Sequence, residues 1–222
     1  PAKDTADPVL EYHFADLADL IDCKWIGYLS TTGVYGDRNG GWVDEDSAQE
    51  PTGPRGEARV TAEARWFDLW WDHDQPVHTF RLAGIYGPGR SALDTVRKGK
   101  ARRINKPGQV FSRIHVEDIV ATLEASMEQP RGGRAYNVCD DNPDAPEAVI
   151  AYACQLLGVE VPPLVPFEEA DLSPMARSFY RDNKRVSNAR IKEELGVELK
   201  WPDYREALPA MLAAEAPDSD PA

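Results

Sequence analysis

The stretch Trp25-Ile26-Gly27-Tyr28-Leu29 decides the predicted fold of this chain, because it is short and almost continuously apolar. Such a run is typical of a parallel strand that is buried on both faces of a sheet. Val77 to Ala83 forms a second run of this kind, and Ala135 to Val138 predicts a shorter strand. We therefore expect these three segments to be the main strands of the fold.

The segments between the strands have the composition and spacing of helices. Pro8 to Ile21 places apolar residues at helical spacing, and Asp7 stands where it can cap the first turn. Pro54 to Asp72, rich in Ala, Arg and Glu, predicts a second helix. Further helices are expected over Val116–Met127 (capped through Glu117 and Asp118), Ala145–Leu157 and Asn188–Leu195, which Gly196 stops. Strands that alternate with helices predict parallel βαβ units, and therefore an α/β fold with a doubly wound parallel sheet.

Turn-forming residues mark most of the remaining chain. Glycine, proline and acidic residues fill Gly33 to Pro54, which predicts a long loop, and Gly84 to Gly89 predicts a tight one. Ile104 to Ile114 predicts a small hairpin around Pro107-Gly108. The small, acidic and proline-containing residues 214–222 predict a disordered tail.

A sheet that binds a dinucleotide also needs a glycine-rich turn, which seats the pyrophosphate on a helix N-terminus. Gly84 to Gly89 contains glycines, but its proline and its spacing do not fit such a turn. The chain also opens at Pro1, without a methionine. We interpret it as lacking the first strands of the sheet, on the order of 80 residues at about 30 or more per βαβ unit.

Composition and charge exclude several classes of protein. The formal net charge of −13 argues against a nucleic-acid binder, because phosphate backbones are held by a surplus of Lys and Arg. No run approaches the roughly 20 apolar residues of a membrane span. The three scattered cysteines form no metal-binding pair and indicate free thiols in a reducing compartment. We therefore expect a cytoplasmic protein without a metal, nucleic-acid or membrane partner.

Four segments resemble one known superfamily in their order and spacing. They are Tyr28-Leu29-Ser30-Thr31-Thr32-Gly33-Val34-Tyr35-Gly36, Arg81-Leu82-Ala83-Gly84-Ile85-Tyr86-Gly87-Pro88-Gly89, Phe111-Ser112-Arg113-Ile114-His115-Val116-Glu117-Asp118 and Tyr136-Asn137-Val138. Together they resemble the extended short-chain dehydrogenases/reductases, the nucleotide-sugar epimerases and dehydratases, and in particular an atypical, YeeZ-like subgroup. The resemblance covers nearly the whole chain and implies a Rossmann-like fold with a small C-terminal substrate-side α+β portion. It implies that residues 1–90 form the C-terminal half of an NAD(P)-binding domain and that residues 91–213 form a substrate-side region, with some elements returning to the sheet.

The resemblance also implies a catalytic site and a cofactor site. Thr31 matches the family's catalytic hydroxyl, which hydrogen-bonds the reacting oxygen of the substrate. The family's Tyr-x-x-x-Lys pair corresponds to Arg55 and Arg59, so Arg59 would take over the lysine's contact with the nicotinamide ribose. Arg55 cannot replace the tyrosine as acid or base, because a guanidinium keeps its proton up to a pKa above about 12. The residues that would bind NAD or NADP are Leu29, Ser30, Arg59, Leu82, Ala83, Gly84 and Ile85.

A substrate wall is implied by the same resemblance. Its candidate residues are Tyr35, Arg55, Arg90, Arg113 and His115. Arg113 would contact an anionic group of the substrate. His115 is the best titrating candidate, because its reference pKa lies near 6.5, and a structural hydrogen bond is its alternative role. Tyr35, Tyr86 and Tyr180 are alternative phenols, although buried tyrosines commonly pack with a satisfied hydroxyl.

Two basic features each allow two interpretations. Arg55 and Arg59 form either a solvated helix face, with Arg59 paired to Glu63, or a fork-like site for a carboxylate or phosphate. The run from Arg97 to Lys106 holds six basic residues in an acidic chain. It forms either a solvated surface or a phosphate-facing loop beside the site.

Three tryptophans, Trp66, Trp70 and Trp71, gather near the end of the second predicted helix. They exceed what one helix face needs for its core. The family's dimers pack through this helix and its neighbour, so we expect a homodimer through residues 8–21 and 54–72 with an aromatic-rich patch.

Three functions remain open at this point. The first is an NAD(P)-dependent oxidoreductase or epimerase that acts on a nucleotide sugar or a small carbonyl compound. The second is a non-catalytic NAD(P)-binding sensor or scaffold, which the loss of the tyrosine favours. The third is that this chain is a fragment without independent function in the absence of its N-terminal half. The fold alone cannot decide among them.

Overall fold

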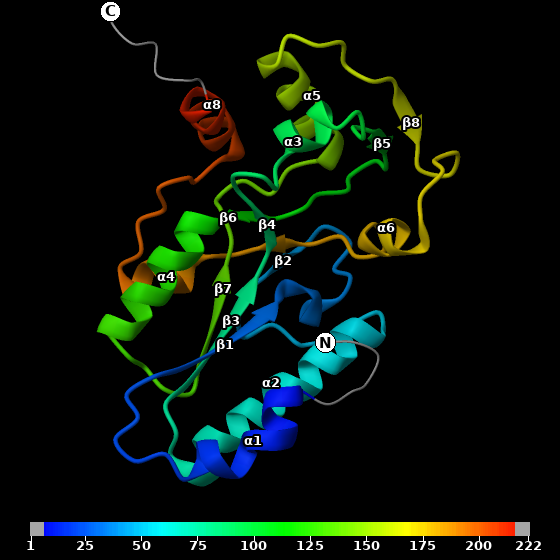
Figure 1. The fold of residues 1–222 in the computed structure, drawn as a ribbon. Coiled ribbons are helices and arrows are strands. Elements are labelled where there is room, and N and C mark those ends of the chain that lie inside the picture. Colours follow the sequence, from blue (N-terminus) through cyan, green and yellow to red (C-terminus); the bar gives the residue numbers. More distant parts are fainter. Residues whose placement is uncertain (1–6, 216–222) are drawn as a thin grey trace, which may run out of the picture.

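A three-stranded parallel sheet lies at the centre of the computed structural model, which describes residues 7–215 (Figure 1). Its strands are β1 (Ile26–Thr31), β3 (Val77–Leu82) and β7 (Arg134–Val138), in the order β1-β3-β7. Both pairings are parallel, with Ile26 opposite Val77 and His78 opposite Arg134. The three strands predicted from the apolar runs are therefore confirmed, and so is the α/β class.

Helices cover both faces of this sheet (Figure 1). On one face, α1 (Pro8–Ala18) and α2 (Pro54–His73) enclose a core that contains Leu10, Trp66 and Val77. On the other face, α4 (Val116–Glu128) and α7 (Ala189–Leu195) pack on Phe80 and Tyr136. Because side chains alternate along a strand, β3 supplies one core with its odd-numbered residues and the other with its even-numbered ones. This arrangement confirms the doubly wound sheet.

The strands β1 and β3 differ in how far their residues are buried. Every residue of the central strand β3 is buried, as predicted for a strand covered on both faces, and this includes the polar residues His78, Thr79 and Arg81. In β1, Tyr28 and Ser30 are buried against α2, whereas Leu29 faces the opposite side and is 46% exposed. The prediction that the Trp25–Leu29 stretch is buried on both faces is therefore wrong at Leu29, because this side chain lines a cleft instead of a core.

Local signals in the sequence account for several helix ends. The Asp7 carboxylate accepts the N–H groups of Val9 and Leu10 at 3.0 and 3.3 Å, which confirms the predicted cap of α1. The helix ends at Ala18, three residues before the predicted end. Gly196 ends α7 in the left-handed conformation, with φ of 66°, as predicted for a glycine stop.

The tryptophans of α2 do not form one surface patch. Trp66 is buried and stacks on Tyr28, with ring centroids 5.3 Å apart. Trp70 packs tightly against Gly132 and Gly133, where an added Cβ would overlap its ring. Trp71 is 72% exposed. Two of the three therefore fill the core.

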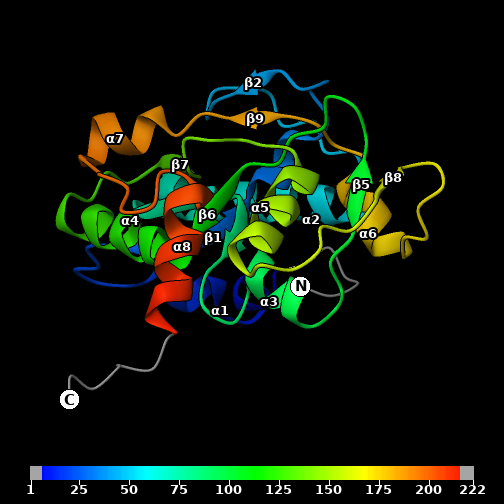
Figure 2. The same cartoon turned by 90° about the horizontal axis from the view of Figure 1, so that it is seen from above.

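A second group of elements packs beyond the carboxyl ends of the central strands (Figures 1 and 2). A core that includes Leu93, Val149 and Leu208 joins its helices, α3 (Ala92–Arg97), α5 (Pro146–Leu156) and α8 (Tyr204–Ala214). Two small parallel pairs complete it: β4 (Gly84–Tyr86) with β6 (Arg113–His115), and β5 (Arg103–Asn105) with β8 (Leu164–Pro166).

These pairings correct two predictions. Gly84 to Gly89 is not only a loop, since it begins with strand β4. The hairpin over Ile104 to Ile114 is wrong, because β5 and β6 pair with separate partners and not with each other. Pro107-Gly108 does form a turn, and Gly108 has φ of 76°. Long-range parallel partners outcompete a local hairpin here.

The predicted loop from Gly33 to Pro54 also contains short elements. It begins inside the 3-10 helix η1 (Thr32–Tyr35) and includes β2 (Trp42–Val43), which pairs in parallel with β9 (Arg185–Val186). The helix α6 (Pro174–Phe179) precedes β9 and has no predicted counterpart. In the part of the chain that the structure describes, no helix is both long and apolar enough to cross a membrane.

The start of α4 corrects a predicted cap. The His115 ring accepts the N–H of Glu117 at 3.3 Å, so His115 is the capping residue. Asp118 instead accepts the backbone N–H groups of Lys200 and Trp201, at 2.7 and 3.1 Å. The predicted tail 214–222 falls almost wholly outside the described residues; Ala214 is the last residue of α8.

Candidate functional site

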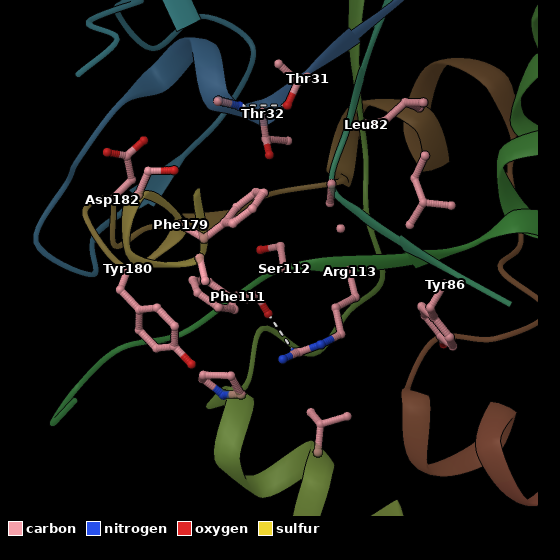
Figure 3. A pocket seen from close by; sticks show the side chains of 18 of the residues that line it. Thr31, Thr32, Leu82, Tyr86, Phe111, Ser112, Arg113, Phe179, Tyr180 and Asp182 are labelled. Carbon is pink, nitrogen blue, oxygen red and sulfur yellow. Dashed lines mark hydrogen bonds between the residues drawn. The ribbon is translucent and has the colours of Figure 1, made fainter. Parts of the chain in front are cut away.

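A cleft of about 1590 Å³ opens at the carboxyl ends of β1 and β3 (Figure 3). The start of α2 and the turn η1 form one wall, and β4, β6, α3 and α5 form the opposite side. The segment 172–184, which includes α6, closes a third side. In doubly wound sheets, ligands bind in such a crevice beyond the carboxyl ends of the strands. The cleft is therefore the candidate site.

Thr31 ends β1 at the edge of this cleft and is half-buried. Its Oγ1 accepts the N–H of Gly33 at 3.1 Å, which starts η1. A hydroxyl that accepts this bond still has its own proton to donate. Thr31 thus has a structural role and keeps a donor that can reach a ligand.

Arg55 and Arg59 both lie in the cleft wall, one turn apart on α2. Arg59 Nη1 donates to the Tyr28 hydroxyl at 2.9 Å and to the Leu29 carbonyl at 3.1 Å. Arg55 is exposed and makes no side-chain hydrogen bond or ion pair with residues 7–215. The alternative in which Arg59 pairs with Glu63 is wrong, because Glu63 is buried and bound elsewhere.

Glu63 belongs to a buried polar network beneath the cleft. Its carboxylate forms an ion pair with Arg81, with Arg81 Nη2 at 2.8 Å from Oε2 and Nε at 3.1 Å from the same oxygen. The Ser30 hydroxyl donates to the other oxygen of Glu63 at 2.5 Å. Ser30, expected to bind the cofactor, lines the cleft but is only 5% exposed and directs its hydroxyl into this network.

Tyr35 completes the network and lies away from the cleft. Arg81 Nη1 donates to the Tyr35 hydroxyl at 2.8 Å, and this hydroxyl donates to Asn137 at 2.7 Å. The Tyr35 side chain has no exposed surface, and burial raises the pKa of its phenol to about 12. The structure therefore corrects its place as a substrate residue: Tyr35 is the packed phenol with a satisfied hydroxyl.

The apolar candidates of the cofactor site do come together. Leu29 projects from β1, while Leu82, Ala83, Gly84 and Ile85 follow β3 into β4, and all of them line the cleft. Leu82 and Ala83 are buried, and Gly84 is exposed. This end of the cleft therefore has an apolar floor beside the Thr31 hydroxyl and the Arg59 guanidinium.

The residues of the predicted substrate wall separate into two groups. Arg90 and Arg113 line the cleft, and Arg113 Nη1 donates to the carbonyls of Phe111 and Asp144 at 2.8 and 3.2 Å (Figure 3). Burial lowers the pKa of the Arg113 guanidinium, although the nearby Asp140 opposes this effect. His115 does not line the cleft; it is 2% exposed and caps α4, and burial lowers the pKa of its ring. The structure therefore corrects the assignment of His115 as a substrate residue. His115 has the structural role that the sequence analysis gave as the alternative.

Basic side chains dominate the charged lining of the cleft. Of the basic run, Lys98, Lys100 and Arg102 line it, whereas Arg97 turns away to pair with Glu215. The full set of basic lining residues is Arg55, Arg59, Arg90, Lys98, Lys100, Arg102, Arg113, Arg181 and Lys184, against the two acids Asp94 and Asp182. In a chain with a net charge of −13, this concentration of positive charge favours an anionic ligand. Part of the run therefore lies beside the site, where the phosphate-facing alternative places it, and contact with a phosphate stays a prediction.

Two further phenols reach the cleft. Tyr86 and Tyr180 both line it, and burial raises the pKa of each above its usual value. The Tyr86 hydroxyl is buried without a partner among the described residues. Tyr180 contacts the rings of Phe111 and Phe167, with centroids 5.4 and 5.3 Å away. Within residues 7–215, no cluster of three or more His, Cys, Asp or Glu side chains could hold a metal ion.

Some site residues lay beyond the sequence predictions. Glu63 and Arg81 form a buried ion pair beneath the cleft, but only the position of Arg81 in a matched segment pointed to it. Asp182 and Lys184 join the cleft from the C-terminal part of the chain, through the pairing of β9 with β2. No spacing within the sequence reveals that pairing.

The fold is that of the NAD-dependent nucleotide-sugar enzymes. dTDP-glucose 4,6-dehydratase from Bacillus anthracis str. Ames, solved in complex with NAD, matches with a TM-score of 0.73 and 19% identity, over 92% of this chain and 64% of that chain. UDP-glucuronic acid 4-epimerase from Bacillus cereus, in complex with UDP-glucuronic acid and NAD, matches with a TM-score of 0.71 and 16% identity, over 87% of this chain and 62% of that chain. At these identities the likeness concerns the fold alone.

The chain belongs to the same family as a functionally unknown conserved protein from Silicibacter pomeroyi DSS. The two are 56% identical and match with a TM-score of 0.92, over 96% of this chain and 76% of that chain. Protein YeeZ of Escherichia coli (strain K12) is 28% identical over 212 residues, which cover 91% of this chain and 70% of YeeZ. No protein-family model matches the chain.

Proposed function

We propose that this protein binds NAD(P) and acts as an oxidoreductase or epimerase on a nucleotide sugar or a small carbonyl compound. The main support is the meeting of Thr31, Arg59 and an apolar floor at the carboxyl ends of β1 and β3. Similar structures with the same fold were solved with NAD and with nucleotide sugars. The basic lining of the cleft supports a substrate with phosphate or carboxylate groups.

The lining fits the nicotinamide and ribose end of the cofactor. Leu82 and Ile85 offer an apolar surface for a flat ring, and Arg59 offers guanidinium donors to ribose hydroxyls. Within residues 7–215, no strand is followed by a glycine-rich turn that could cradle the pyrophosphate. NAD(P) bound here would supply or accept a hydride.

Thr31 has the chemistry to stabilise charge on the reacting oxygen. Its Oγ1 is fixed by the Gly33 N–H, so the hydroxyl proton points away from that bond and can be donated. A fixed donor of this kind is typically worth about 10²–10³ in rate when it meets developing negative charge. Arg55 keeps its proton and can only bind or orient an anionic group.

A non-catalytic NAD(P)-binding sensor is the second candidate function. Arg55 favours it, because the sequence resemblance matches this residue to the family's acid–base tyrosine, and a guanidinium cannot exchange a proton at neutral pH. The sensor would use the same cleft and the same Arg59 contact.

Cofactor binding and turnover separate the two functions. NADH and NADPH are titrated by fluorescence, and absorbance loss at the nicotinamide band is then followed with UDP-glucose, UDP-glucuronic acid, dTDP-glucose and simple aldehydes and ketones. Turnover that falls about 100-fold in Thr31→Ala and is retained in Thr31→Ser supports the enzyme. Cofactor binding without turnover on any compound supports the sensor, and turnover unaffected by Thr31→Ala refutes the role of Thr31.

We further propose a cytoplasmic homodimer that pairs through α1 and α2. Tyr12 on α1 and Trp71 on α2 support this pairing, since they are 74% and 72% exposed. The free thiols of Cys23, Cys139 and Cys154 support a reducing compartment. Light scattering after gel filtration should give a dimer that Trp71→Glu dissociates, whereas Trp42→Glu, an exposed tryptophan on β2, should leave it intact. A monomeric wild type would contradict the dimer.

A further inference from the structure

Two guanidinium groups with free N–H donors lie in the cleft wall where α2 begins. Arg55 and Arg181 both line the cleft and are exposed to solvent. Among residues 7–215, Arg55 has no side-chain hydrogen bond or ion pair, and Arg181 Nη1 donates to the Thr52 carbonyl at 2.8 Å. A guanidinium has five N–H donors, so most donors of both groups are available to a ligand.

Contacts of the backbone bring the two arginines to the same place. The Thr52 carbonyl that accepts from Arg181 belongs to the segment that leads into α2. Arg181 Nη1 also lies close to Gly53, since a Cβ added to this glycine would be 3.2 Å away from it. The Thr52 hydroxyl bonds to Asp182, the residue after Arg181. The Arg181 guanidinium is therefore held next to the first turn of α2, which carries Arg55.

The start of α2 is also in contact with the turn that follows Thr31. A Cβ added to Gly56, the residue after Arg55, would lie 3.1 Å from the Gly33 carbonyl oxygen. The N–H of the same Gly33 donates to Thr31 Oγ1 at 3.1 Å. The two arginines therefore belong to the end of the cleft that contains Thr31.

Positive charge exceeds negative charge around the two arginines. Arg59 and Lys184 line the same end of the cleft and add two further cations. Asp182, on the same side of the pocket as Thr32 (Figure 3), is an acid of this lining, but its carboxylate already has Lys184 Nζ at 3.6 Å. Glu57, in the first turn of α2, is exposed and does not line the cleft. A cleft wall with an excess of one charge attracts ligands of the opposite charge.

We propose that Arg55 and Arg181 form a binding site for a carboxylate or phosphate group of the substrate, beside the part of the substrate that reaches Thr31. A guanidinium can donate two parallel N–H bonds to the oxygens of either group, so both anions share the chemistry that this pair recognises. The substrate class is thus a carbonyl or hydroxyl compound with an anionic group near its reacting carbon. This inference rests on the proposed function for the reaction, whereas binding of the anion requires neither cofactor nor turnover.

This site also gives a role to the arginine at position 55. The sequence resemblance matches this position to the family's acid–base tyrosine, and a guanidinium keeps its proton at neutral pH. Arg55 therefore cannot take over proton exchange, but it can hold an anion. The consequence of the arginine is a change in which substrates the cleft accepts.

The first experiment measures how fast arginines are labelled, without cofactor or turnover. The protein reacts with phenylglyoxal at constant ionic strength, set with sodium chloride, and peptide mass spectrometry follows each arginine. D-Glucuronate and inorganic phosphate are the anionic probes, and D-glucose is the neutral control for glucuronate. We expect at least one of the anions to slow the labelling of both Arg55 and Arg181 several-fold, and glucose to leave it unchanged. The anion that protects identifies the group that the site prefers.

Arg131 is the matched control for this labelling. It is exposed, does not line the cleft and precedes β7, so it lies at the opposite, amino end of the parallel strands. Its labelling should not change with any probe, and equal protection of Arg131 would overturn the proposal by showing a general effect of the anions. Unchanged labelling of Arg55 or of Arg181 in both anions would also overturn it.

The second experiment tests whether the two arginines act together. The affinity for the protecting anion is read from the labelling of Arg181. It should fall about tenfold or more in Arg55→Gln, because a charged donor is lost, and by less in Arg55→Lys, which keeps the charge but not the fork. Arg131→Gln should leave this affinity unchanged. An unchanged affinity in Arg55→Gln would refute the paired site. A wild type that turns over no compound would refute the proposed function, whereas protection of both arginines would still establish the anion site.

Discussion

Asp140 makes the stability of this protein depend on pH in a direction opposite to that of most carboxylates. The residue follows β7, is 1% exposed, and neither of its carboxylate oxygens has a hydrogen-bond partner among residues 7–215. Burial raises its pKa to about 8, although the charge of Arg113 opposes this rise. The folded protein therefore holds a proton that an unfolded aspartate releases near pH 3.8.

The sign and size of the effect follow from linkage. Because the pKa is higher in the folded state, the contribution to stability is fully present below about pH 4 and is lost as the pH rises towards 8. The two pKa values lie about four pH units apart, and each unit corresponds to 1.36 kcal/mol, so the total loss is on the order of 5 kcal/mol. Most domains unfold at a cost of only about 5–15 kcal/mol. Asp140→Asn removes the titration while it keeps the shape of the side chain.

Urea unfolding followed by tryptophan fluorescence tests this at pH 5 and pH 8. Relative to Asp140→Asn, the wild type should lose roughly 4 kcal/mol of unfolding free energy between these two pH values. Asp68→Asn is the matched control, because Asp68 is exposed and should leave the pH dependence of the wild type unchanged. An equal difference between wild type and Asp140→Asn at both pH values would refute the reasoning.

Three further substitutions test contacts that stabilise the fold. Glu63→Ala should lower the unfolding free energy by about 3–5 kcal/mol, because Arg81 is then left buried without its counterion; a urea midpoint close to that of the wild type would contradict this. Asp7→Ala should cost about 1 kcal/mol and increase hydrogen exchange in the first turn of α1, and unchanged exchange there would show that the cap is dispensable. Gly36→Ala should destabilise the protein by at least about 2 kcal/mol, since φ is 65° and the new Cβ would lie 1.8 Å from the Glu50 carbonyl oxygen. A thermal midpoint within 1 °C of the wild type would show that this loop adapts.

The sequence predicted the central sheet well because its signals are local. Strand segments of four to seven residues, separated by helices with caps and glycine stops, indicate both the strands and their parallel order. The short strands outside the central sheet depend instead on tertiary contacts. Residues 84–86 and 113–115 carry turn signals nearby, yet they pair with each other as β4 and β6 across more than one intervening element.

The part of the candidate site that lies at the carboxyl ends of the central strands could be predicted from the sequence. Thr31 is the last residue of β1 and Leu82 the last residue of β3, and parallel strands bring such ends to one edge of the sheet. Tyr35 and His115 were misplaced, because sequence spacing does not show whether a side chain turns into the core or the cleft. Lys184 enters through the β2–β9 pairing, which no local pattern indicates.

The Glu63–Arg81 ion pair also has a consequence for the orientation of α2. Successive residues of an α-helix are rotated by about 100°, so Arg59 and Glu63, four residues apart, share one face. Anchoring Glu63 to β3 fixes how far α2 is turned about its own axis, and thereby points Arg55 and Arg59 at the cleft. A substitution that breaks the Glu63–Arg81 ion pair would allow α2 to rotate about its own axis. The positions of Arg55 and Arg59 in the cleft would then change while the sheet stayed intact.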